Sequence, residues 1–229
     1  IVPYHARTTR DGRTLALCSA RADESLIVDL ATETVETTIK TNSQTDRAVL
    51  SPDGRWVATC GWHARAVQVW DARTAALVKE LPLGTMTLVA FSPDSKHLIT
   101  SRYDEFCFWE VGSWRKVNTI PRENCPYPGT VAFSPDGSIM ALELASATVS
   151  FLDVETGRTL AKLEDPNRDR PSWMGYTPDG SRFVVISTYA KNIHVWDLRL
   201  IREQLATMGL DWAPSFDSPR EQVAAGDLP

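Results

Sequence analysis

The chain has 229 residues, of which 43% are hydrophobic, and its formal net charge is −5. This length is enough to bury a core, and the acidic balance argues against a general nucleic-acid-binding protein, which would carry a basic surplus. The sequence holds no apolar run long enough to span a membrane, so we expect neither a nucleic-acid nor a membrane partner. Because it begins at Ile1 rather than Met, we expect it to start inside a longer protein.

One short turn recurs five times along the chain at nearly even spacing. Its aspartates lie at positions 11, 53, 94, 136 and 179, so the steps between them are 42, 41, 42 and 43 residues. Ser or Thr stands two residues before each aspartate, and Gly or Ser follows it. In such a turn the aspartate accepts a backbone hydrogen bond and glycine permits a positive φ. A period near forty residues predicts a repeat architecture.

Short apolar segments flank each turn and are typical of strands, such as residues 88–91 before the third turn and 98–100 after it. A second motif, an apolar residue followed by an acidic one, recurs in every repeat. Its acidic residue lies 16 to 18 residues after the turn aspartate: Val28-Asp29, Trp70-Asp71, Trp109-Glu110, Leu152-Asp153 and Trp196-Asp197. A further strand then follows, as at 159–163. Four short strands per repeat form one small antiparallel sheet, which must stack on its neighbours to bury its faces.

These turns, together with Trp70-Asp71, Trp109-Glu110 and Trp196-Asp197, resemble the WD-repeat family of β-propellers. The resemblance implies an all-β fold of five blades of four antiparallel strands over residues 1–197, divided at about 1–41, 42–83, 84–124, 125–167 and 168–197. The Gly-His pair that usually precedes the first strand is absent from every repeat. We therefore do not expect the family's Asp-His-Ser-Trp hydrogen-bond network, and we expect apolar packing, with the three motif tryptophans in the core.

The end of the fifth repeat differs from the others. Strong helix formers follow Asp197 and predict a helix over 198–208, with Asp197 as its N-cap and Gly209 just past its end. Its apolar residues step by three and four, forming one stripe: Leu198, Ile201, Leu205 and Met208. The helix thus replaces the fourth strand of the last blade, residues 198–212 form a helix and packing segment, and 213–229 form a flexible tail.

In a closed propeller the N-terminus usually supplies the missing strand, but only eight residues precede Thr9, and the first strand needs them. We expect this chain to be the C-terminal five repeats of a longer propeller, for example one of seven blades, or a fragment of one. The segments 196–199 and 209–212 resemble the ends of bacterial, planctomycete-type WD-repeat proteins. That resemblance implies an upstream effector domain, such as a Ser/Thr kinase, in the same protein.

Catalytic signatures are missing from the sequence: it has no G-x-S-x-G, P-loop, G-x-G-x-x-G or H-E-x-x-H motif. We expect no cofactor and no metal, and we interpret His194 as a structural residue. No C-x-x-C pair is present, which argues against a zinc site. Cys18 and Cys60 occupy equivalent positions and are interpreted as buried filler, whereas Cys125 is expected to be exposed in its Pro-rich loop. Reduced thiols fit a cytoplasmic location.

The loops between the second and third strands are the best candidates for a binding site. The resemblance places them on the upper rim of the propeller, and they carry aromatic and basic residues, as do protein-binding hot spots. The loops 122–128 and 165–171 are expected at the same rim. The candidate protein-binding residues are Trp62, His63, Arg65, Arg102, Tyr103, Tyr189 and Lys191. The alternative is that these rings pack over the channel mouth or on each other.

The leading hypothesis is a non-enzymatic module or scaffold that binds a protein or peptide partner. Two alternatives stay open: an enzyme or small-ligand binder that uses the central channel, and a structural spacer array without a specific ligand. Three or more His, Asp or Glu side chains facing the channel around an ion would favour the enzyme. An exposed aromatic patch on the rim would favour the interaction module.

Overall fold

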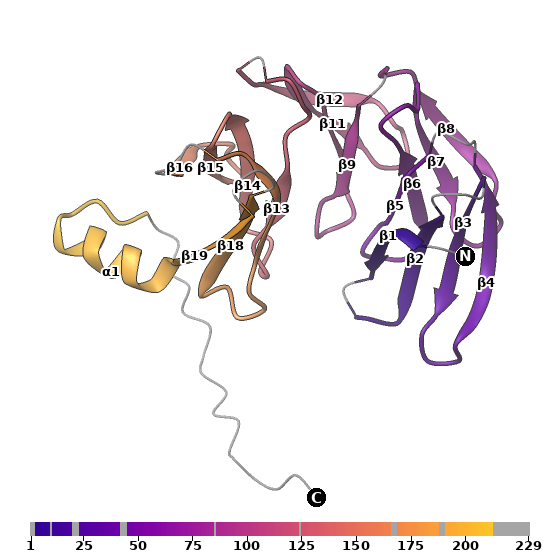
Figure 1. Ribbon diagram of the computed structural model, residues 1–229, viewed down its shortest axis with the longest axis horizontal. Coiled ribbons are helices and arrows are strands. Elements are labelled where there is room, and N and C mark those ends of the chain that lie inside the picture. Colours follow the sequence, from indigo (N-terminus) through magenta and orange to yellow (C-terminus); the bar gives the residue numbers. More distant parts are fainter. Residues whose placement is uncertain are drawn as a thin grey trace, which may run out of the picture.

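A computed structural model of the chain describes residues 3–9, 11–19, 23–41, 45–84, 86–123, 125–165, 169–187 and 191–212. The tail predicted at 213–229 lies outside these residues. The described chain folds into small antiparallel sheets that stand side by side around a central space (Figure 1). In each sheet the strands follow one another in sequence order. The predicted all-β propeller is therefore confirmed.

Four sheets have four strands each. The first contains β1 (Pro3–Thr8), β2 (Thr14–Ser19), β3 (Glu24–Asp29) and β4 (Thr34–Lys40). The second contains β5 (Arg47–Leu50), β6 (Trp56–Cys60), β7 (Val67–Asp71) and β8 (Leu77–Leu81). The third contains β9 (Leu88–Phe91), β10 (His97–Ser101), β11 (Glu105–Glu110) and β12 (Lys116–Pro121). The fourth contains β13 (Val131–Phe133), β14 (Ile139–Ala145), β15 (Thr148–Asp153) and β16 (Thr159–Glu164).

The fifth sheet has three strands, β17 (Pro171–Tyr176), β18 (Arg182–Ser187) and β19 (Asn192–Asp197), and is followed by α1 (Leu198–Thr207). The predicted helix is confirmed. The Asp197 carboxylate accepts the backbone N–H of Leu200, and Gly209 has φ +71°. The predicted stripe is wrong at its end, because Met208 is 61% exposed. Within the described residues, no helix is both long and apolar enough to cross a membrane.

Local chemistry accounts for the five turns. In the second, the Ser51 hydroxyl donates to the Asp53 carboxylate, which also accepts the N–H of Arg55 at 3.1 Å. Ser95 takes the place of glycine in the third turn and has φ +59°. Hydrogen bonds of this kind hold the pKa of the Asp11 carboxyl below its usual range, chiefly through the Thr9 hydroxyl. Each turn is therefore specified within about five residues of chain.

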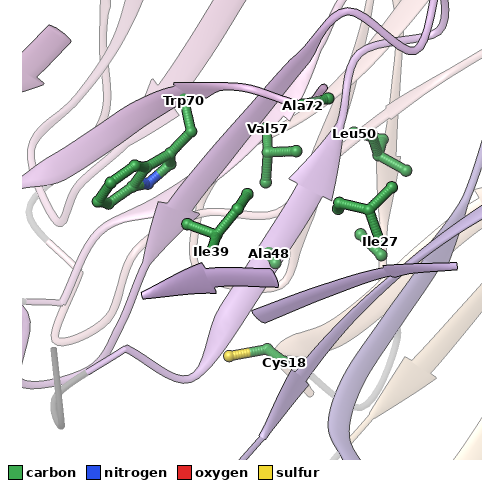
Figure 2. Packing of buried hydrophobic residues seen from close by; sticks show 9 residues of the cluster. Cys18, Ile27, Ile39, Ala48, Leu50, Val57, Trp70 and Ala72 are labelled. Atoms are coloured by element: carbon green, nitrogen blue, oxygen red, sulfur yellow. The ribbon is translucent and has the colours of Figure 1, made fainter. Parts of the chain in front are cut away.

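The apolar core lies between the sheets. Among the described residues it forms four clusters, one at each seam between successive sheets. Figure 2 shows the first seam, where Cys18 and Ile27 of the first sheet face Ala48 and Val57 of the second. Burying a side chain the size of Ile27 contributes about 1.5–3 kcal/mol, so each seam joins its two blades firmly.

Two sequence expectations about this core need correction. Cys125 is 3% exposed, so the prediction of an exposed thiol is wrong; its loop folds back onto the third sheet, where the Cys125 N–H donates to the Tyr103 carbonyl. The polar network expected to be missing is also partly present. The indole N–H of Trp70 donates to the Thr59 hydroxyl at 2.9 Å, and Trp109 makes the same bond to Thr100 at 3.0 Å.

Candidate functional site

One rim of the propeller gathers loops from four neighbouring blades. Trp62 lies between β6 and β7, and Tyr103 lies between β10 and β11. Tyr127 belongs to the long connection from β12 to β13, and Arg170 directly precedes β17. The antiparallel hairpin order brings the ends of these strands to the same edge of the ring.

Aromatic rings and guanidinium groups contact one another on this rim. The rings of Trp62 and Tyr127 lie 5.6 Å apart between centroids, and the Arg170 guanidinium lies 4.9 Å from the Tyr127 ring. In the neighbouring loop the Arg102 guanidinium lies 5.1 Å from the Tyr103 ring. Such geometry is favourable for aromatic and cation–π contacts. We call this set the rim patch: Trp62, Arg102, Tyr103, Tyr127 and Arg170.

Two aromatic side chains of the rim patch remain open to solvent. Trp62 is 40% exposed and Tyr103 is 39% exposed. The backbone around Trp62 is nevertheless fixed, because its N–H donates to the Asp46 carboxylate at 2.8 Å and its carbonyl accepts the N–H of Met86. The patch therefore offers large aromatic area on a loop that is already held in place.

A buried arginine supports the rim patch from below. The Arg122 side chain is fully buried, and its Nε donates to the Glu143 carbonyl at 2.7 Å. Its Nη1 donates to the carbonyls of Arg102 at 2.8 Å and of Tyr127 at 3.0 Å. One planar guanidinium thus ties two rim loops to a strand of the fourth blade.

The charge of Arg122 is balanced by Glu143, which is also fully buried. The Glu143 carboxylate lies 3.5 Å from the Arg122 Nη2, accepts the Nε–H of Arg170 at 2.9 Å and accepts the Thr130 N–H at 3.0 Å. Burial raises the pKa of the Glu143 carboxyl, and the Arg170 and Arg122 guanidiniums oppose that rise. Gly129 is required here, since a Cβ at this position would lie 2.6 Å from the Arg122 Nε.

The structure brings together some of the residues predicted from sequence. Trp62, His63 and Arg65 are exposed on one loop, and Arg102 with Tyr103 lies on the next. Lys191 is exposed in the fifth blade, and Tyr189 lies outside the described residues. Sequence reasoning placed the loops 122–128 and 165–171 at the rim but did not single out residues within them. The aromatic residue between two prolines at 126–128 was the available signal for Tyr127.

The central channel is the second candidate site. It has a volume of about 390 Å³ and is lined by the inner strands β1, β5, β9, β13 and β17. Among the described lining residues there is one histidine, His5, and no Asp or Glu. The cluster of three such side chains that would favour the enzyme hypothesis is therefore not found in the described wall.

One group of side chains at the seam between the fourth and fifth blades could hold a metal ion. The ligand atoms of Asp165, Asp169 and His194 lie within 4.8 Å of one another. The His194 Nε2 is 3.2 Å from the Asp165 carboxylate, so a protonated His194 would form an ion pair there. The pair of His194 with Asp165 joins the fifth blade to the end of the fourth, and the structural interpretation of His194 stays a prediction.

Comparison with known proteins gives the same fold. Over 137 residues the chain is 30% identical to the WD repeat-containing protein SL1-17 of Schistosoma mansoni, covering 58% of this chain and 44% of that protein. Over 121 residues it is 25% identical to the serine-threonine kinase receptor-associated protein of Dictyostelium discoideum, covering 52% of this chain and 39% of that protein. The chain thus spans less than half the length of these two relatives. No family model matches it.

Among solved structures, the chain is similar to hydrazine synthase of Kuenenia stuttgartiensis, with a TM-score of 0.63 and 21% identity. The match covers 86% of this chain and 66% of that one. At this level of identity the likeness concerns the fold alone.

Proposed function

We propose that this chain, a propeller of WD-type repeats similar to WD-repeat proteins, is a non-enzymatic protein-interaction module whose rim patch binds a peptide or protein segment. The observation that carries the proposal is the exposed Trp62 ring, which packs against the tilted ring of Tyr127 in the loop that the buried Arg122 holds. Trp, Tyr and Arg are enriched among the residues that dominate binding energy at protein interfaces, and the rigid aromatic side chains bury much area at a small entropic cost.

The buried base under the patch favours binding over mere surface packing. Holding a loop by buried, charge-assisted hydrogen bonds lowers the conformational entropy that binding must remove. Arg122 makes bonds of this kind to both the Tyr103 and the Tyr127 loops. The rim is thus ordered before any partner arrives, while its aromatic faces stay accessible.

We infer that further blades belong to the working propeller. The outer face of the fifth sheet is apolar and open: Ile193 is 66% exposed and Val195 is 56% exposed. An apolar sheet face of this kind is stabilised when another blade stacks on it. The Dictyostelium relative is named for its association with a serine-threonine kinase receptor, which supports a kinase as a partner. The four free, buried cysteines suit the reducing cytoplasm.

The experiment is a selection of binding peptides from a displayed random library, followed by affinity measurement with fluorescence anisotropy. Peptides that dock on the rim should bind Trp62→Ala at least about tenfold more weakly, since a hot-spot residue contributes about 2 kcal/mol or more. Tyr103→Ala should weaken the same peptides.

The matched control is Val117→Ala, which removes a 45%-exposed apolar side chain from the outer strand β12. It should leave the dissociation constants unchanged. Peptides that bind all three variants as tightly as the unsubstituted chain would exclude the rim patch as the site. A selection that enriches no peptide would favour the spacer array.

A further inference from the structure

Equivalent positions of the five repeats meet in the central channel. The residues six before each turn aspartate form one level of the wall, and those four before it form a second level. The first level consists of His5, Arg47, Leu88, Thr130 and Trp173. The second level consists of Arg7, Val49, Ala90, Ala132 and Gly175. In Figure 1 the strands that carry them, among them β1, β5, β9 and β13, face the central space.

The charges of this wall are concentrated on two adjacent blades. Arg7 comes from β1 and Arg47 from β5, and these two strands lie against each other. No Asp or Glu is among the described residues that line the channel. Two cationic side chains therefore line the same side of the channel without a carboxylate in the described wall.

The two guanidinium groups differ in what they contact. Arg47 has a carboxylate neighbour in Asp46, at an Nε–Oδ1 distance of 3.7 Å, which is too long for a good hydrogen bond. The other oxygen of Asp46 accepts the Trp62 N–H. The Arg7 side chain is exposed to solvent and forms no hydrogen bond or ion pair within the described part of the chain. Its donors are available to a ligand.

His5 responds to the same positive field. Burial, followed by the charges of Arg47 and Arg7, lowers the pKa of His5 to about 4. The ring is therefore neutral at pH 7. Its Nδ1 lies 3.2 Å from the Ala48 carbonyl, and because a carbonyl only accepts, Nδ1 carries the proton.

The wall opposite the arginines leaves room for a ligand. At the second level it presents Ala90 and Ala132, whose side chains are small, whereas the Trp173 ring lies against Gly175. The volume of about 390 Å³ lies in the range of ordinary ligand sites. A carboxylate or phosphate matches the planar fork of an arginine and would gain two donors at once.

We propose that the channel binds an anionic group, a carboxylate or a phosphoryl group carried by a peptide segment, between Arg7 and Arg47. The site does not require the rim patch, although Asp46 touches both Arg47 and the backbone of Trp62. A peptide is the expected carrier rather than a nucleic acid, because the net charge of −5 repels an extended polyanion.

The test uses three fluorescein-labelled peptides of equal length in a Gly-Ser background, with a central pair of glutamates, phosphoserines or glutamines. Binding is measured by fluorescence anisotropy at low and at physiological salt. We expect the two charged peptides to bind and the glutamine peptide to bind at least about tenfold more weakly. The difference between the glutamate and phosphoserine peptides then identifies the preferred anion.

The variants are Arg7→Gln, Arg47→Gln and their combination, with Arg73→Gln as the matched control on an exposed outer turn. All three single variants change the net charge equally, so a general electrostatic effect would move them together. We expect a loss of about tenfold or more for the channel variants and less than about twofold for the control.

A second measurement on the unsubstituted chain does not depend on the folding of any variant. Inorganic phosphate, added at constant ionic strength, should raise the pKa of His5 above its value of about 4, as followed by NMR of the imidazole. Equal binding of the glutamine peptide, equal losses for Arg73→Gln and Arg7→Gln, or an unmoved His5 titration would each overturn the proposal. Tighter binding of a single-stranded oligonucleotide than of either charged peptide would overturn the choice of a peptide carrier.

Discussion

The substitution Arg122→Met should destabilise the chain more than any change on its surface. It removes the bond from Nε to the Glu143 carbonyl and the bonds from Nη1 to the carbonyls of Arg102 and Tyr127. It also removes a positive charge beside the fully buried Glu143 carboxylate. The lost interactions are internal, so water cannot replace them without opening the rim.

The expected magnitude follows from what remains. Removing one partner of a buried ion pair costs about 3–5 kcal/mol. Glu143 still accepts the Nε–H of Arg170 at 2.9 Å and the N–H of Thr130 at 3.0 Å, so its charge stays partly balanced. Methionine refills much of the volume left by the longer side chain. We therefore expect the lower end of that range, a loss of about 3 kcal/mol in the free energy of unfolding.

Urea denaturation followed by tryptophan fluorescence measures this loss. With a slope of about 2–3 kcal/mol per molar urea, the midpoint should fall by about 1–1.5 M. The control is Arg115→Met, because Arg115 is 75% exposed and lies 3.5 Å from Glu110. Such a surface pair should change stability by less than about 0.5 kcal/mol.

The double variant Arg122→Met with Glu143→Leu tests the cause. If the cost comes from an imbalanced buried charge, removing the carboxylate as well should restore part of the stability, since Arg170 can turn to solvent. The reasoning is refuted if Arg122→Met lowers the free energy of unfolding by less than about 1 kcal/mol. It is also refuted if the double variant loses more free energy of unfolding than the sum of the losses in the two single variants.

Three further outcomes are expected. Thr59→Val keeps the side-chain shape but leaves the buried Trp70 N–H without its acceptor, so it should cost about 1–2 kcal/mol in urea denaturation; an unchanged midpoint would contradict it. Gly129→Ala brings a Cβ to 2.6 Å from the Arg122 Nε and should lower the melting temperature through a loss of about 1–3 kcal/mol; a stable variant would show that the loop yields. The pKa of His5 is about 4 in the folded chain and about 6.5 in the unfolded chain. Between these two pH values, only the unfolded chain binds a proton at His5. Stability should therefore fall by up to about 3 kcal/mol as pH falls through that window, and the fall should be smaller in His5→Gln; equal pH profiles would contradict it.

Some features of this protein follow from the sequence because they are fixed by neighbours in the chain. The turn around Asp53 is closed by Ser51 and Arg55, and the cap of α1 is closed by Asp197 and Leu200. Such bonds span two to three residues, so the local residue types specify them. The period of these turns then indicates the propeller, since a small sheet with two apolar faces must stack on its copies.

Local sequence could not predict which residues meet in the rim patch. The expected rim aromatics came from equivalent hairpin loops, yet Trp62 of the second blade packs on Tyr127, which belongs to the connection between the third and fourth blades. The same limit explains the error at Cys125: its Pro-rich loop suggested exposure, but the loop folds against the third sheet. Local sequence describes a loop's residues, not the surface onto which it closes.

The sequence by itself determined the repeating strand units, their tight turns and the helix that ends the last blade, because those features depend on hydrogen bonds between close neighbours. Tertiary structure alone decided that Arg122 supports two rim loops from beneath and that Arg7 and Arg47 share one channel wall. These arrangements join residues on different blades, and the packing at the seams sets which side chains meet there.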